Sequence, residues 1–147
     1  MRSMVQIEEA IKELRFNENP PAAADALLGL AEEVLEHWVT ARDMTPTTES
    51  REGFRLLALH RQGAKGEPAF NACRETCREL AYYYNLVTMQ SDHPETDSHA
   101  EMMKLIANHL YLFVGGRMQV AELGDFCCSS KPIRLSADNT IANNKEI

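Results

Sequence analysis

The longest regular apolar pattern in the chain lies in residues 20–39, PPAAADALLGLAEEVLEHWV. Apolar side chains recur there three or four positions apart, as on one face of a helix: Ala24, Leu27, Leu28, Ala31, Val34, Leu35, Trp38 and Val39. Asn19 can cap such a helix, and Pro20 suits its first position, because the N–H that proline lacks would have no partner there. We therefore expect a helix of about four to five turns.

Three more segments on either side of this one show helical spacing. The first helix is expected to begin at Ser3, whose hydroxyl can form a capping box with Gln6. A short third helix follows the cap-then-proline pair Thr45-Pro46 and is expected to end at Gly63. The fourth helix is expected to begin at Pro68. Its core stripe consists of Phe70, Cys73, Cys77, Leu80, Tyr84 and Val87.

A fifth helix is expected to begin at a second capping box, formed by Ser98 and Glu101, and to end at Gly115-Gly116. Few positions between Met102 and Val114 are polar, so this helix is apolar over most of its circumference and must be covered on more than one side. Two arrangements would cover it. The helix could lie in the centre of the bundle, or it could pack one face on the core and another face on a second subunit. The second arrangement motivates the hypothesis of a homodimer.

These segments predict an all-α fold, an antiparallel bundle of four to five helices in residues 1–126. Residues 127–147 are polar, and we expect an irregular C-terminal tail or one docked on a partner subunit.

No apolar run reaches the roughly 18–20 residues that span a bilayer, and the first residues turn acidic before a signal-peptide core could form. Four cysteines are too few for a disulfide scaffold, so we expect reduced thiols in the cytoplasm. The net charge of −7 argues against a nucleic-acid partner, because phosphates would be repelled on average.

The first candidate site is the pair Cys73 and Cys77, which lie one helical turn apart on one face. Such a pair can hold a soft metal if two further ligands join. The candidates for those ligands are His99, His109, Cys127 and Cys128. Zinc and thioredoxin-like motifs separate their cysteines by two residues rather than three. The favoured interpretation is therefore that both cysteines pack as small apolar core residues.

The second candidate site is the polar face of the same helix, together with two nearby cations. Its candidate ligand-binding residues are Arg61, Lys65, Asn71, Arg74, Arg78 and Tyr82. Residues 51–90 hold six basic and four acidic side chains, whereas the segments on either side are acidic. Arginine offers a bidentate fork to phosphate or carboxylate. The alternative is a solvated helix side, with Glu75 and Arg78 forming an ordinary surface ion pair.

No Ser–His–Asp order, nucleotide fingerprint or paired-carboxylate motif stands out, so the sequence assigns no catalytic residue and no cofactor. The first hypothesis is a small cytoplasmic interaction or regulatory protein without catalytic activity, acting through its helix faces as a homodimer or with another protein partner. The second is a metal- or thiol-dependent protein with its site at Cys73 and Cys77. The third is a binder of a small anionic ligand between Arg61, Lys65 and Arg74.

Overall fold

The structure is a computed structural model that describes residues 2–121, and this part of the chain is all-α. It contains α1 (Met4–Glu13), α2 (Pro20–Ala41), α3 (Arg55–Ala64), the 3₁₀ helix η1 (Pro68–Cys73), α4 (Arg74–Met89) and α5 (Thr96–Val120). The predicted all-α bundle is confirmed. The predicted tail, residues 127–147, lies outside the described residues.

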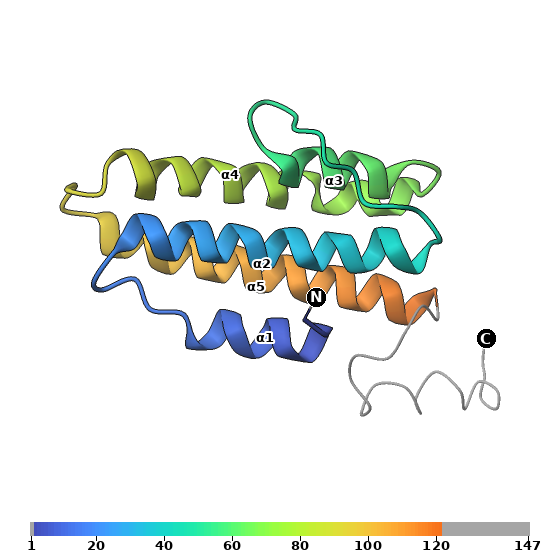
Figure 1. Ribbon diagram of the computed structural model, residues 1–147, viewed down its shortest axis with the longest axis horizontal. Helices are drawn as coiled ribbons and strands as arrows, with labels where there is room; N and C mark the ends of the chain where they lie inside the picture. Colours follow the sequence, from blue (N-terminus) through green and yellow to red (C-terminus); the bar gives the residue numbers. More distant parts are fainter. Residues whose placement is uncertain (1, 122–147) are drawn as a thin grey trace.

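Helices α2 and α5 form the middle of the bundle. In Figure 1, α3 and α4 lie above them and α1 lies below. Helix α2 packs against α1, α3, α4 and α5, while α5 packs against α1, α2, α4 and η1. The central place of α2 follows from its wide apolar face, because a helix with apolar side chains over much of its circumference needs neighbours on several sides.

The core gathers around the predicted stripe of α2. Its largest fully buried side chain is Trp38, which stacks on Phe70 of η1 with ring centroids 4.7 Å apart. The Trp38 indole N–H donates a hydrogen bond to the carbonyl of Gly63, 2.9 Å away. This contact joins α2 to the end of α3, so the buried indole has a partner for its one polar atom.

Some helix ends agree with the sequence and others differ. The capping box of Ser3 and Gln6 is present, and Asn19 caps α2 as predicted. The predicted start of the third helix after Thr45-Pro46 is wrong, because α3 begins at Arg55 and residues 42–54 connect it to α2. From Pro68 the chain forms the 3₁₀ helix first and becomes α-helical only at Arg74.

Both predicted ends of the fifth helix are wrong. Helix α5 begins at Thr96, whose buried hydroxyl donates to carbonyls of the preceding turn, so Ser98 lies inside the helix and makes no cap. Helix α5 also continues past Gly115-Gly116 to Val120. Gly115 is buried against the core, whereas a Cβ on Gly116 would meet open space. Glycine therefore does not end this helix, because neither residue adopts the left-handed conformation of a C-terminal stop.

Candidate functional site

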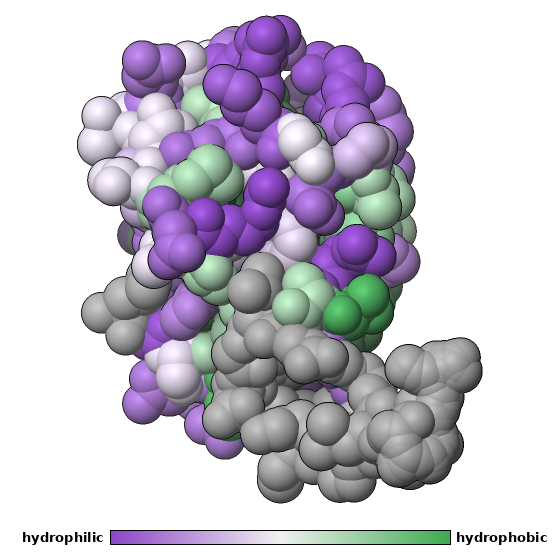
Figure 2. Space-filling view, turned by 90° about the vertical axis from the view of Figure 1, so that its right-hand side faces the viewer, coloured by the Kyte–Doolittle hydropathy of each residue, from purple (hydrophilic) through white to green (hydrophobic). Residues whose placement is uncertain are grey.

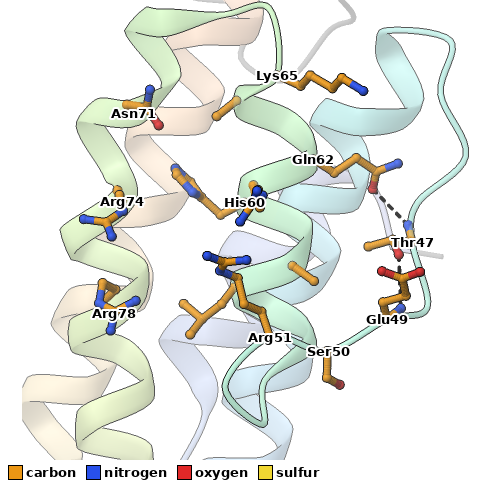
Figure 3. A pocket seen from close by; sticks show the side chains of 14 residues that line it. Thr47, Glu49, Ser50, Arg51, His60, Gln62, Lys65, Asn71, Arg74 and Arg78 are labelled. Carbon is orange, nitrogen blue, oxygen red and sulfur yellow. Dashed lines mark hydrogen bonds between the residues drawn. The ribbon is translucent and has the colours of Figure 1, made fainter.

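A groove of about 860 Å³ opens on the side of the bundle that carries α3. Helix α3 runs along it, with η1 and α4 on one side and the connection between α2 and α3 on the other (Figure 3). In the end-on view of Figure 2, hydrophilic residues cover the upper part of the molecule, where α3 and this connection lie. The groove therefore has a polar surface above the apolar core.

Five cationic side chains line the groove and come from three segments of the chain. They are Arg51 of the connection, Arg61 of α3, Lys65 at the end of α3, and Arg74 and Arg78 of α4. Glu49 is the only carboxylate among the described lining residues. The chain as a whole has a net charge of −7, so the groove concentrates positive charge on an otherwise acidic molecule.

Hydrogen bonds hold the connection beside α3. The Gln62 side chain donates to the carbonyl of Thr45 at 2.7 Å and accepts from the backbone N–H of Thr47 at 2.9 Å. Arg55 donates to the Thr47 carbonyl at 2.8 Å and forms an ion pair with Glu36 of α2. This side of the groove is thus fixed to α3, and Arg55 in turn is held by α2.

The tip of the connection closes the groove through an ion pair. Glu52 and Gly53 both have positive φ and form a tight turn between Arg51 and Phe54, whose backbone groups hydrogen-bond to each other. The Glu52 carboxylate accepts two hydrogen bonds from Arg78, at 2.9 and 3.0 Å. These hydrogen bonds and the charge of Arg78 lower the pKa of Glu52, so the carboxylate stays ionised at neutral pH.

The cations differ in how they are neutralised. Arg78 is paired with Glu52, and Arg74 lies 3.3 Å from its neighbour Glu75. Among residues 2–121, Arg51, Arg61 and Lys65 make no ion pair, and Arg61 and Lys65 lie one turn apart at the end of α3. Both are exposed at the groove, so their charges are available to a ligand.

A buried thiol pair lies below the groove. Cys73 and Cys77 are 1% and 0% exposed, and they lie four positions apart at the start of α4. His60 of α3 is buried too, but its ring lines the groove. Its Nε2 lies 3.2 Å from the carbonyl oxygen of Phe70, and the Cys73 thiol donates a hydrogen bond to the same oxygen at 3.3 Å.

The surroundings separate the two thiols chemically. The neighbouring Cys77 thiol and the His60 ring lower the pKa of Cys73 to about 6, against the opposing effect of burial. The neighbouring Cys73 thiol and burial both raise the pKa of Cys77 well above the ordinary value.

The structure brings together five of the six residues predicted to bind a ligand. Arg61, Lys65, Asn71, Arg74 and Arg78 all line the groove. The sixth predicted residue lies outside it. Tyr82 is 58% exposed further along α4, with its ring edge-on to Tyr83.

The predicted metal ligands are not gathered at one place. Cys73 and Cys77 are adjacent, but His109 is exposed on α5 and the ring of His99 contacts those of Tyr83 and His93. Residues 2–121 contain no group of three or more histidine, cysteine or carboxylate side chains placed to hold a metal ion. Cys127 and Cys128 lie outside the described residues.

The sequence pattern did not predict that Arg51, His60 and Gln62 line the groove, or that Glu52 pairs with Arg78. The positive charge balance of residues 51–90 was the one sequence signal that included them.

Comparison of the chain with models of protein families, with curated proteins and with solved structures found no match in any of the three. None of the helices in residues 2–121 combines the length and apolarity needed to cross a bilayer.

Proposed function

We propose that this protein is a non-enzymatic binding protein that holds an anionic organic ligand in the groove along α3. The observation that carries the proposal is the convergence of five cations from three chain segments on one groove of an acidic molecule. Arginine binds phosphate and carboxylate groups through its planar fork, and lysine binds them as a point charge.

The size of the groove and the spread of its cations favour a ligand with more than one anionic group. A volume of about 860 Å³ lies within the roughly 300–1,000 Å³ of small-molecule pockets. Arg61 and Lys65 are free to bind one anionic group, and Arg74 stands across the groove on α4 (Figure 3). An extended nucleic acid or a membrane surface would meet the acidic remainder of the molecule, so neither is part of the proposal.

The experiment is a calorimetric titration of the full chain with inorganic phosphate, pyrophosphate and citrate. We expect the polyanions to bind more tightly than phosphate, with affinity falling as salt is added, because added ions screen exposed charges. Arg61→Gln and Lys65→Gln should each weaken binding roughly tenfold, as expected for the loss of one charge-assisted hydrogen bond.

Lys12→Gln is the matched control, since it removes one positive charge from α1, on the side of the bundle away from α3 (Figure 1). Binding should be unchanged in this variant. An absence of binding by every anion, or an equal loss in Lys12→Gln, would overturn the proposal.

A second proposal is that the protein acts as a homodimer through the outer face of α5. Met102, Leu105 and Leu112 are 41%, 65% and 59% exposed, and they lie with His109 and Gly116 on one face at spacings of three and four. In an antiparallel pair of α5 helices crossing at His109, Met102 of one copy would face the open space at Gly116 of the other. This large-to-small match favours a second copy as the occupant of the face.

A cytoplasmic location remains part of the proposal. Cys73 and Cys77 are free thiols, the state that a reducing compartment such as the cytoplasm maintains. The location itself rests on this chemistry and is tested by fractionating cells that express the chain.

A further inference from the structure

We infer that the ligand of the groove is a small phosphomonoester, whose phosphoryl group binds among Arg51, Arg74 and Arg78 in place of the Glu52 side chain. The observation that carries the inference is that Arg78 already holds a carboxylate of the chain itself, beside two further arginines that line the same groove. The inference rests on the proposed binding of an anionic ligand, and it adds which group of that ligand binds where.

The contact between Glu52 and Arg78 shows that this end of the groove binds an anion. Nη1 of Arg78 donates to one carboxylate oxygen of Glu52 at 3.0 Å, and Nη2 donates to the other at 2.9 Å. Arginine recognises carboxylate and phosphoryl groups through two parallel hydrogen bonds of this kind. The Arg78 and Glu52 side chains are 38% and 52% exposed, so a ligand from solvent can compete for the arginine.

Two more arginines lie near the Glu52 carboxylate without bonding to it. The hydrogen bonds and charge of Arg78 lower the pKa of Glu52 most, and the charges of Arg51 and Arg74 lower it further. Figure 3 shows the head of Arg51 on the side of α3 that faces α4, where Arg74 and Arg78 project. Arg74 has an exposed pair with Glu75, and contacts of that kind are weak. Both arginines are therefore available to an anion that takes the place of the carboxylate.

A phosphoryl group fits the three arginines better than a carboxylate does. Arg78 occupies both oxygens of Glu52, and neither Arg51 nor Arg74 donates a hydrogen bond to them. A phosphomonoester has three terminal oxygens and a charge of about −1.5 to −2 at neutral pH. It can therefore accept hydrogen bonds from all three guanidinium groups, whereas a carboxylate that binds Arg78 through both oxygens cannot.

The backbone at Glu52 is unusual for the residue that it carries. Glu52 has φ 55°, in the left-handed region that residues other than glycine rarely adopt, and Gly53 follows with φ 86°. Asparagine, aspartate and glycine are the residues favoured at the first central position of such a turn. The side chain that glutamate adds is long enough to bring a carboxylate to Arg78. Glu52 thus acts as an internal competitor, which neutralises Arg78 until a group that binds the arginines better displaces it.

The test is a calorimetric titration of the full chain with phosphoglycolate and with succinate. Both probes carry a carboxylate, separated by two atoms from a second anionic group that is a phosphoryl group in one and a carboxylate in the other. Phosphoglycolate should bind the parent chain roughly tenfold more tightly, because only its phosphoryl group engages all three arginines. Arg51→Gln and Arg74→Gln should each remove most of this preference.

Two variants test the internal competitor. Glu52→Gln should bind phosphoglycolate roughly tenfold more tightly than the parent, the factor expected if Glu52 occupies Arg78 for about nine tenths of the time. Glu52→Asn should show the same gain. Because asparagine favours this turn, a gain in that variant cannot come from loosening the backbone.

Glu79→Gln is the matched control, since it removes the same charge from an exposed position of α4 that makes no ion pair with any residue of 2–121. Its affinity for phosphoglycolate should equal that of the parent. The inference is overturned if the parent binds succinate as tightly as phosphoglycolate, if neither Glu52 variant gains affinity, or if Glu79→Gln gains as much. Polyanion binding in the groove would still stand in those cases. If the parent and both Glu52 variants bind none of the anions, the proposed function is overturned together with the inference.

Discussion

Gly63 shows how one residue can be fixed by packing rather than by backbone conformation. It lies inside α3, one residue before the helix ends, and its φ is not positive. A Cβ placed there would lie 2.7 Å from Cδ1 of Trp38 and 3.2 Å from Cε2 of Phe70. Because both rings are buried and stacked on each other, neither can move without disturbing the core.

Gly63→Ala should therefore destabilise the fold by about 1–3 kcal/mol, the usual cost of overpacking, despite the better helix propensity of alanine. The matched control is Gly29→Ala in α2, where a Cβ meets nothing within 4 Å. That variant should gain about 0.5–1 kcal/mol. Urea unfolding followed by the fluorescence of the single tryptophan, Trp38, measures both. Equal stability of the two variants would mean that the stacked rings of Trp38 and Phe70 shift to make room for the added methyl group at little cost in free energy.

At this scale the sequence predicted which side chains point inward but not what they touch. The stripe through Phe70, Cys73 and Cys77 is buried, and Arg74 on the next face is exposed, both as the helical period required. The meeting of His60 and Cys73 at the carbonyl of Phe70 was not predictable, because it depends on how the chain turns between α3 and η1. Spacing along one helix carries no information about that turn.

Helix starts are decided by side chains that compete for the same backbone groups. At α1, the Ser3 hydroxyl accepts from the N–H of Gln6 at 3.2 Å, and the Gln6 side chain accepts from the N–H of Ser3 at 2.9 Å. At α5, the hydroxyl of Thr96 donates to the carbonyls of Gln90 and His93, which fixes the preceding turn and starts the helix two residues before Ser98. The same sequence signal, serine followed by an acid or amide three residues later, is thus a cap in one place only.

Ser3→Ala should cost roughly 1 kcal/mol of stability, because an N-terminal N–H of α1 loses its partner. Ser98→Ala removes an exposed hydroxyl from within α5 and should change stability by less than about 0.5 kcal/mol. Urea unfolding monitored by circular dichroism compares the two. A larger loss for Ser98→Ala than for Ser3→Ala would contradict the assignment of the caps.

The helices themselves were predictable because each carries an apolar stripe at helical period, and the stripe of α2 accounts for its central place. The connection between α2 and α3 was not. Its position depends on hydrogen bonds from Gln62 and Arg55 to backbone carbonyls and on the turn at Glu52. These contacts join residues that are 8 to 17 positions apart, beyond the reach of any local pattern.

At the scale of the whole molecule, the groove is a product of chain topology. The sequence marked Arg61, Lys65 and Arg74 as neighbours because they lie close along the chain. It could not place Arg51 with them, because that requires the connection to fold back along α3. The uneven charge of the chain predicted a basic surface somewhere in residues 51–90, but only the packing of α3 beside α4 makes that surface concave.

The outer face of α5 gives the prediction that concerns the assembly. Its exposed apolar side chains belong to the helix whose other sides pack against α1, α2, α4 and η1. We expect the full chain to sediment as a dimer at micromolar concentration, because removing the exposed apolar side chains of α5 from water is favourable. Leu105→Glu or Leu112→Glu should give a monomer with unchanged helix content, since a charge buried in the interface would have no partner.

Met89→Glu supplies the comparison that makes this test specific. Met89 is 78% exposed at the end of α4 and does not belong to the face formed by Met102, Leu105, His109, Leu112 and Gly116, so the same kind of substitution should leave the dimer intact. If Met89→Glu also dissociates the protein, the contact lies elsewhere than on α5. If the parent chain sediments with the mass of one subunit, the face is not covered by a second copy, and residues 122–147 of the same chain become the next occupant to test.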